Sequence, residues 1–199
     1  MKKFTSLCFS VFLLSFIWLG SAQQNQKTIV IDAGHGGKDP GNIQENVQEK
    51  DFTFQLSNTL REALEEKGYE VILLRENDEY MSLNERIERI NEIKPKLVLS
   101  LHANAAHNTS KNGIEIYFAE GEDLNETNSN FISKLTYNLT SQTKYKEVNI
   151  KTANFKILTE SNSPALVLEL GFMSNPKDLA YIKSKKGQQE IAKALTASL

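Results

Sequence analysis

Short apolar segments alternate with amphipathic segments along residues 28–101, and this alternation limits the possible folds more than any other feature of the chain. The β-branched run IVI at residues 29–31 is typical of a strand. Apolar residues then recur at helical spacing in residues 52–64, and the same order repeats up to residue 101. Strands joined by helices form right-handed crossovers. The alternation therefore predicts an α/β fold with a mostly parallel, twisted central sheet of about six strands, flanked by helices on both faces.

The rest of the chain continues in this way without a linker, so we expect a single domain over residues 26–199. Ser82, followed three residues later by Glu85, forms a capping-box signature for a helix that Pro95 closes. Residues 42–48 are polar and are expected to form a flexible connection. Strands are predicted at residues 28–31, 69–75, 97–101, 113–118, 156–158 and 165–170, and helices at 49–67, 83–93, 128–141, 188–199 and, as a short one, after Pro176.

The N-terminal segment, residues 1–22, has the layout of a secretory signal peptide. A basic start at Lys2 and Lys3 is followed by an apolar stretch over residues 7–19 and then by small residues. We therefore predict an exported protein that is periplasmic or secreted after cleavage. The apolar stretch is too short for a membrane span and no second one follows, so no membrane span is expected.

Composition narrows the chemistry of the exported part. The only cysteine, Cys8, lies in the predicted signal peptide, so the mature chain is expected to have neither a disulfide nor a cysteine-held metal. Without Lys2 and Lys3, 21 of the 23 basic residues remain against 25 acidic residues, which gives a net charge of −4. Nothing in this balance indicates nucleic acid as a partner. Any bound metal must be held by His, Asp or Glu.

A glycine-rich loop, GHGGKDPG, follows the first predicted strand and carries a histidine. His35 stands where the strand becomes a loop, at the edge where α/β sheets place their functional groups. His102 directly follows the strand at residues 97–101, and Glu49 opens the helix after the loop. Two histidines, one glutamate and an open position are an established arrangement for catalytic zinc. Separations of 14 and 53 residues mean that only tertiary folding can bring the three together.

Each of these residues also has a simpler interpretation. A histidine in a loop is most often a solvated polar group, and Glu49 could complement the positive end of a helix dipole. His107 stands among Asn and Ala residues and is interpreted as a solvated loop histidine. The glycine loop could cradle a phosphate, but it contains neither GxxxxGK[ST] nor GxGxxG.

Glu169 is the residue that is hardest to explain without a function. It lies in the predicted strand at residues 165–170, where Leu166 and Leu168 take one face. Val167 shares the other face with Glu169, so that face is apolar as well. A carboxylate in such surroundings must be paired, exposed at an edge or functional. Near a zinc ion, it would be the general base that takes a proton from water.

Four segments, in order along the chain, resemble the motifs of zinc-dependent N-acetylmuramoyl-L-alanine amidases. They are IVIDAGHGGKDPG, QEKD, SLHANAA and VLELGFMSNPKD, with supporting matches in LLRENDEYMSLNERI and GIEIYF. The resemblance implies one zinc ion per chain, held by His35, Glu49 and His102, and a catalytic role for Glu169. Ala33 stands where the family often has proline and Leu170 where it often has threonine or alanine, but neither change removes a reactive group.

The resemblance further implies a hydrolase of peptidoglycan that cleaves the amide between the lactyl group of N-acetylmuramic acid and L-alanine of the stem peptide. A zinc peptidase that acts within the stem peptide, or a catalytically inactive wall-binding module, remain alternatives. Some relatives are inhibited by an additional helix after the strand that corresponds to residues 113–118. Here only 12 residues, Ala119–Asn130, precede the next apolar helix face, too few for such a helix and its links. We therefore expect an open site that needs no activator, in a protein that acts as a monomer.

Overall fold

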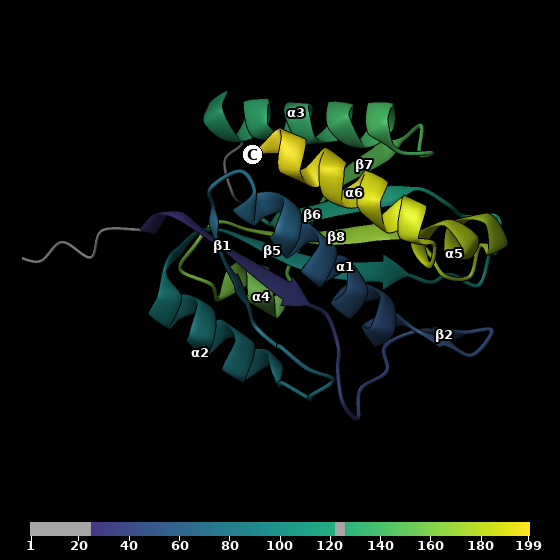
Figure 1. Ribbon diagram of the computed structural model, residues 1–199, viewed down its shortest axis with the longest axis horizontal. Coiled ribbons are helices and arrows are strands. Elements are labelled where there is room, and N and C mark those ends of the chain that lie inside the picture. Colours follow the sequence, from purple (N-terminus) through teal and green to yellow (C-terminus); the bar gives the residue numbers. More distant parts are fainter. Residues whose placement is uncertain (1–24, 122–125) are drawn as a thin grey trace, which may run out of the picture.

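The computed structural model describes residues 25–121 and 126–199, which form one α/β domain around a six-stranded sheet (Figure 1). The strand order is β4-β1-β5-β8-β6-β7. The predicted signal peptide at residues 1–22 lies outside the described residues. The strands of the sheet are β1 (Asn25–Ala33), β4 (Glu70–Leu73), β5 (Pro95–Asn104), β6 (Ile114–Ala119), β7 (Val148–Ala153) and β8 (Ala165–Phe172).

The sheet is mostly parallel, as the alternation of strands and helices predicts. β1 pairs in parallel with β4 and β5, β5 with β8, and β6 with β7. The exception is β6, which runs antiparallel to β8. Because of this reversal, the start of β6 lies at the same edge of the sheet as the ends of β1, β5 and β8. That shared edge carries the candidate functional site.

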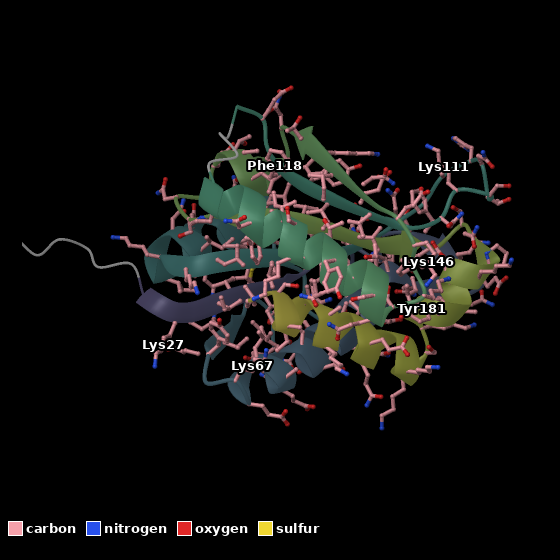
Figure 2. All side chains as sticks on the ribbon, turned by 90° about the horizontal axis from the view of Figure 1, so that it is seen from above. Lys27, Lys67, Lys111, Phe118, Lys146 and Tyr181 are labelled. Atoms are coloured by element: carbon pink, nitrogen blue, oxygen red, sulfur yellow. The ribbon has the colours of Figure 1, made fainter. Side chains whose placement is uncertain are left out.

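Helices cover both faces of the sheet (Figure 1). Residues of four helices join one large apolar cluster on one face, and α3 and α6 lie side by side there (Figure 2). Two further helices join a smaller cluster on the other face. The first group is α1 (Glu49–Glu65), α3 (Glu126–Gln142), α5 (Pro176–Ile182) and α6 (Lys185–Ser198), and the second is α2 (Leu83–Ile93) and α4 (Lys156–Thr159).

The two clusters follow from the alternation of side chains along each strand. In β1, Ile29 and Ile31 belong to the large cluster, whereas Val30 belongs to the small one. Successive side chains of a strand point to opposite faces, so a strand that is buried on both sides needs an unbroken apolar run. Sequence reasoning recognised these strands by such runs, and the predicted fold class is confirmed.

The helix that begins after Ser82 is capped as predicted. The Ser82 side chain accepts a hydrogen bond from the backbone N–H of Glu85, and the Glu85 side chain accepts one from the backbone N–H of Ser82. The helix ends at Ile93, and its C-cap residue Lys94 has a φ of 52°, the left-handed conformation common at helix ends. Pro95 is already the first residue of β5, so the helix stop and the next strand are contiguous.

Three sequence predictions differ from the structure. Residues 156–158 belong to helix α4 and do not form a strand. The sixth strand of the sheet is instead β7, which was not predicted. It is an edge strand that is half exposed and rich in polar residues, so it lacks a clear apolar pattern. Residues 42–48 are not a loose connection. They form a hairpin of β2 (Ile43–Gln44) and β3 (Val47–Gln48), and its turn residues Glu45 and Asn46 both have positive φ.

The connection between β6 and α3 bears on access to the site. β6 ends at Ala119 and α3 begins at Glu126, so the intervening stretch is shorter than the sequence interval Ala119–Asn130 suggests. Residues 122–125 lie outside the described residues. Among the helices that the structure describes, none combines the length and apolar character that crossing a membrane requires.

Candidate functional site

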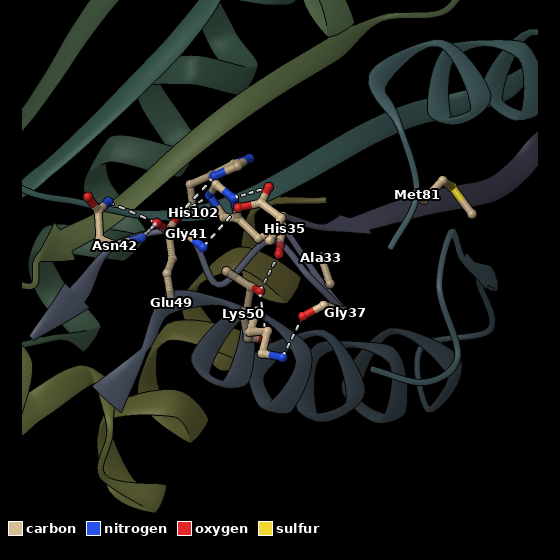
Figure 3. A network of polar contacts seen from close by, with 12 residues as sticks. Ala33, His35, Gly37, Gly41, Asn42, Glu49, Lys50, Met81 and His102 are labelled. Carbon is tan, nitrogen blue, oxygen red and sulfur yellow. Dashed lines mark hydrogen bonds and ion pairs between the residues drawn. The ribbon is translucent and has the colours of Figure 1, made fainter. Parts of the chain in front are cut away.

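His35, Glu49 and His102 meet at the sheet edge where β1 and β5 end (Figure 3). His35 lies in the loop after β1, Glu49 is the first residue of α1, and His102 lies near the end of β5. Glu49 Oε1 lies 3.1 Å from His35 Nε2 and 3.0 Å from His102 Nδ1. The two imidazole rings are nearly perpendicular, with centroids 5.0 Å apart. One ligand atom from each residue lies within 4.8 Å of the others, so the cluster could hold a metal ion.

The carboxylate of Glu49 is held in place by donors from two different segments. Its Oε2 accepts hydrogen bonds from the backbone N–H of Asn42 at 2.9 Å and from Asn42 Nδ2 at 2.8 Å. Its Oε1 accepts one from the backbone N–H of Ala103 at 3.0 Å. Burial raises the pKa of Glu49, but both imidazoles outweigh it and hold this pKa well below its usual range. The side chain is therefore a carboxylate that is fixed before any ligand arrives.

His35 is oriented by an acid in its own loop. Its Nδ1 lies 2.8 Å from Asp39 Oδ2, which leaves Nε2 directed at Glu49 (Figure 3). A carboxylate on one ring nitrogen is the usual support of a histidine that ligates metal through the other. Burial lowers the pKa of His35, whereas Glu49 and Asp39 outweigh it and raise the pKa to about 9. The backbone of His35 has a φ of 62°, a conformation rare for a residue with a side chain and often found at functional sites.

Two glycines leave the space that these side chains occupy. A Cβ atom on Gly34 would lie 2.4 Å from His102 Cε1. A Cβ atom on Gly41 would lie 2.6 Å from His35 Cδ2 and 2.7 Å from Glu49 Oε2, and Gly41 also has a φ of +65°. The glycine-rich loop is therefore shaped around the two histidines and the glutamate, which explains its composition better than a phosphate cradle does.

Two buried arginines hold the backbone at the point where β1 becomes the loop. Arg86 donates to the carbonyl of Ala33 at 3.0 Å and to that of His35 at 2.7 Å, and it pairs with the buried carboxylate of Asp32. Arg75 Nε donates to the same Ala33 carbonyl at 3.0 Å. Buried carbonyl groups need donors, and a planar guanidinium supplies several in fixed directions. These arginines thus fix the backbone that carries His35.

Glu169 lies on β8, in register with His102 of β5 on one side and with Glu115 of β6 on the other. Directly paired residues on neighbouring strands point to the same face, so Glu169 projects beside His102. Among the described residues, its buried Oε2 has no hydrogen-bond partner. Burial is the main reason that the pKa of Glu169 is raised to about 7. A carboxyl group with this pKa can accept and return a proton near neutral pH.

The structure thus brings together all four residues that the sequence singled out. His107 lies apart from them, exposed in the loop after β5, as expected. Sequence reasoning missed Asp39, Asn42, Arg75 and Arg86, which support the cluster without belonging to it. Asp39 and Asn42 could have been noticed because they lie four residues after His35 and seven residues before Glu49. The contacts of Arg75 and Arg86 join distant segments and leave no local pattern.

Known proteins similar to this chain are found both by sequence and by structure. The family model described as N-acetylmuramoyl-L-alanine amidase matches residues 29–199. The chain is 34% identical to the sporulation-specific N-acetylmuramoyl-L-alanine amidase of Bacillus subtilis, over 83% of this chain and 64% of that protein. It is 31% identical to the probable cell wall amidase LytH of Staphylococcus epidermidis, over 91% of this chain and 60% of that protein. The chain therefore spans less than two thirds of the length of either relative.

A solved structure shows the same fold over nearly its whole length. The N-acetylmuramoyl-L-alanine amidase from Clostridium difficile 630 superimposes with a TM-score of 0.80 at 29% identity. The match covers 87% of this chain and 95% of that chain. The fold of this chain is therefore similar to that of nearly the whole of the solved chain.

Proposed function

The chain belongs to the N-acetylmuramoyl-L-alanine amidase family, and from this premise we propose that it hydrolyses peptidoglycan. The bond cleaved is the amide between the lactyl group of N-acetylmuramic acid and L-alanine of the stem peptide. The observation that carries the proposal is the buried Oε2 of Glu169, on the strand next to His102, which has no hydrogen-bond partner in the part of the chain that the structure describes. A proton acceptor beside a candidate metal site is the combination that metal-assisted amide hydrolysis requires.

We propose that the metal is one zinc ion per chain, held by His35, Glu49 and His102. The donor set fits this ion, because two imidazoles and one carboxylate are an established ligand set of catalytic zinc. The support of Glu49 by Asn42 and of His35 by Asp39 also fits, since a fixed orientation of the donors favours binding. When bound there, zinc supplies Lewis-acid polarisation of the scissile carbonyl and makes a water molecule more acidic.

Glu169 moves the proton in this reaction. Its carboxylate accepts a proton from the attacking water, whose oxygen forms the new bond to the lactyl carbonyl carbon. Glu169 then returns the proton to the nitrogen of L-alanine as the amide bond breaks, so that the stem peptide leaves as an amine. In the metal-free protein the pKa of Glu169 is raised above that of a solvated carboxyl group, which makes the carboxylate a better proton acceptor. Burial of the side chain is the main cause of this raised pKa.

The cellular setting is proposed on the same basis. Peptidoglycan lies outside the cytoplasm, which agrees with the signal peptide predicted at residues 1–22, so we place the mature protein in the periplasm or outside the cell. We further propose that it acts as a monomer without an activator. The short sequence interval between β6 and the apolar face of α3 supports only the second part, that no activator is needed.

Digestion of purified peptidoglycan followed by mass spectrometry tests the proposed reaction. We expect stem peptides with a free L-alanine amino group and glycan chains whose lactyl groups end in a carboxylate. Cleavage between amino acids would instead identify a zinc peptidase that acts within the stem. Binding to the wall without new chain ends would identify an inactive wall-binding module.

The matched control is Glu169→Gln, which keeps the shape of the side chain but removes its basicity. We expect this variant to retain zinc and to lose at least about 100-fold in turnover. Loss of zinc from Glu169→Gln would make Glu169 a metal ligand and would contradict the role given to it here.

A further inference from the structure

The sheet face that carries Glu169 is covered over only part of its length. Val30, Val98 and Val167 on this face pack against α2 and α4. Nearer the functional edge, the same face carries polar side chains in register across neighbouring strands. One row runs from His102 to Glu169 and Glu115. The adjacent row includes Tyr117 of β6 and Lys151 of β7.

Glu115 is the centre of a polar cluster on this open face. Its carboxylate accepts hydrogen bonds from Asn104 Nδ2 at 3.0 Å and from the hydroxyl of Tyr117 at 2.7 Å, and it forms an ion pair with Lys151. Burial raises the pKa of Glu115, but the opposite effect of Lys151, Tyr117 and the charge of Lys111 is larger. The pKa is therefore below its usual value, and the group is ionised. Lys151 is the cation that pairs directly with this carboxylate.

Lys151 is the member of this cluster that is available to a ligand. Its side chain is 44% exposed, whereas that of Glu115 is 11% exposed. An ammonium group has three N–H donors, and Glu115 takes one of them, so two remain for a ligand. The ring of Phe155, which is 42% exposed, packs at a centroid distance of 5.1 Å against Tyr117 and borders the cluster on the α4 side. The ammonium is thus fixed by Glu115 and open to solvent.

The order of strands gives the substrate a direction on this face. The two candidate histidine ligands lie at the ends of β1 and β5, the proton acceptor lies on β8, and the Glu115 and Lys151 pair lies on β6 and β7. Under the proposed function, on which this inference rests, Glu169 must reach the nitrogen of the departing L-alanine. The peptide side of the scissile amide therefore lies on the β8 side of the site. An extended peptide that continues in this direction passes over β6 toward β7.

We propose that Lys151 binds a carboxylate on the second residue of the stem peptide, counted from the scissile amide, and so selects substrates with a free acid at that position. Paired residues on adjacent strands have side chains about 5 Å apart, and the ammonium lies one ion-pair distance beyond Glu115, which places it roughly 8 Å from Glu169. Two residues of extended chain span about 7 Å. The separation therefore matches a carboxylate at the second residue.

The test uses two synthetic N-acetylmuramoyl peptides that differ only at the second residue, which bears either a free α-carboxylate or the corresponding carboxamide. Specificity is measured as the ratio of kcat/KM for the acid to that for the amide. We expect a ratio of about 5 to 10 for the wild type, a size set by one partly exposed ion pair, and a ratio near one for Lys151→Met. Lys151→Arg should restore most of the preference, because the positive charge is kept.

Two controls separate binding from chemistry and from general effects of charge. Lys134→Met removes an exposed lysine from α3, on the opposite face of the sheet, and should keep the wild-type ratio. In a Glu169→Gln background, calorimetry should show the same loss of preference as a ratio of Kd values when Lys151→Met is added. This second readout does not depend on turnover.

An unchanged ratio in Lys151→Met, or a wild type that cleaves both peptides equally well, would overturn the inference and leave the proposed function intact. A wild-type protein with full zinc that cleaves neither peptide nor whole peptidoglycan would overturn the proposed function, and the inference with it.

Discussion

Replacing Glu169 by glutamine should stabilise the metal-free protein above neutral pH while abolishing the activity proposed for it. Burial raises the pKa of Glu169 from the usual 4.5 to about 7 in the folded state. A difference of about 2.5 units corresponds to about 3 kcal/mol of free energy. Glutamine has nearly the same shape but cannot ionise, so the variant avoids this cost. Residues that serve catalysis often reduce stability in this way.

The sign of the effect depends on pH. Below pH 4.5 the folded and unfolded states both keep the proton on Glu169, and the cost vanishes. As the pH rises, the unfolded state releases the proton first, so this group lowers the free energy of unfolding progressively until about pH 7. The full difference between wild type and variant is therefore present only above that pH.

Urea unfolding of both proteins at pH 4 and pH 8, with a chelator present, measures this difference. The chelator is needed because a bound cation would lower the pKa of a nearby carboxyl group. Between the two pH values we expect the stability of Glu169→Gln to increase by about 3 kcal/mol relative to the wild type. Titrating groups that do not interact with Glu169 contribute equally to both proteins and cancel. A stability difference that is the same at pH 4 and pH 8 would refute the burial argument.

The metal site and its support give four other expected outcomes. His35→Ala and His102→Ala should each lose zinc in elemental analysis, and full occupancy in either variant would contradict the ligand assignment. Zinc affinity, measured by competition with a chelating dye, should fall as the pH drops below about 9, because protons compete with zinc for His35. An affinity that does not change with pH would argue against His35 as a ligand. Arg86→Met should lower the free energy of unfolding by about 3–5 kcal/mol, because it leaves the buried carboxylate of Asp32 without its cation. A loss below about 1 kcal/mol would be inconsistent with this ion pair. Purified protein should degrade isolated peptidoglycan unaided; activity that appears only on adding a periplasmic extract would reveal an activator.

The features that the sequence determined are those that local chemistry fixes. A short apolar run that is bounded by turn residues and rich in β-branched or leucine residues favours a strand that is buried on both faces, so β1, β5 and β8 could be predicted. The capping box at Ser82 and Glu85 satisfies helix N–H groups within four residues and needs no distant partner. The positions of His35 and His102 followed as well, because each lies at the end of such a strand.

Only the tertiary structure decided the features that depend on contacts between distant segments. β7 has a weak apolar pattern and exists because β6 offers it an edge, whereas residues 156–158 form a helix that packs against α2. The support of Glu49 joins Asn42 to Ala103, which are 61 residues apart. Likewise, the antiparallel pairing of β6 with β8 sets Glu115 and Lys151 beside Glu169. A hydrogen bond or ion pair between distant residues requires only that their side chains meet, so it imposes no spacing that the sequence could reveal.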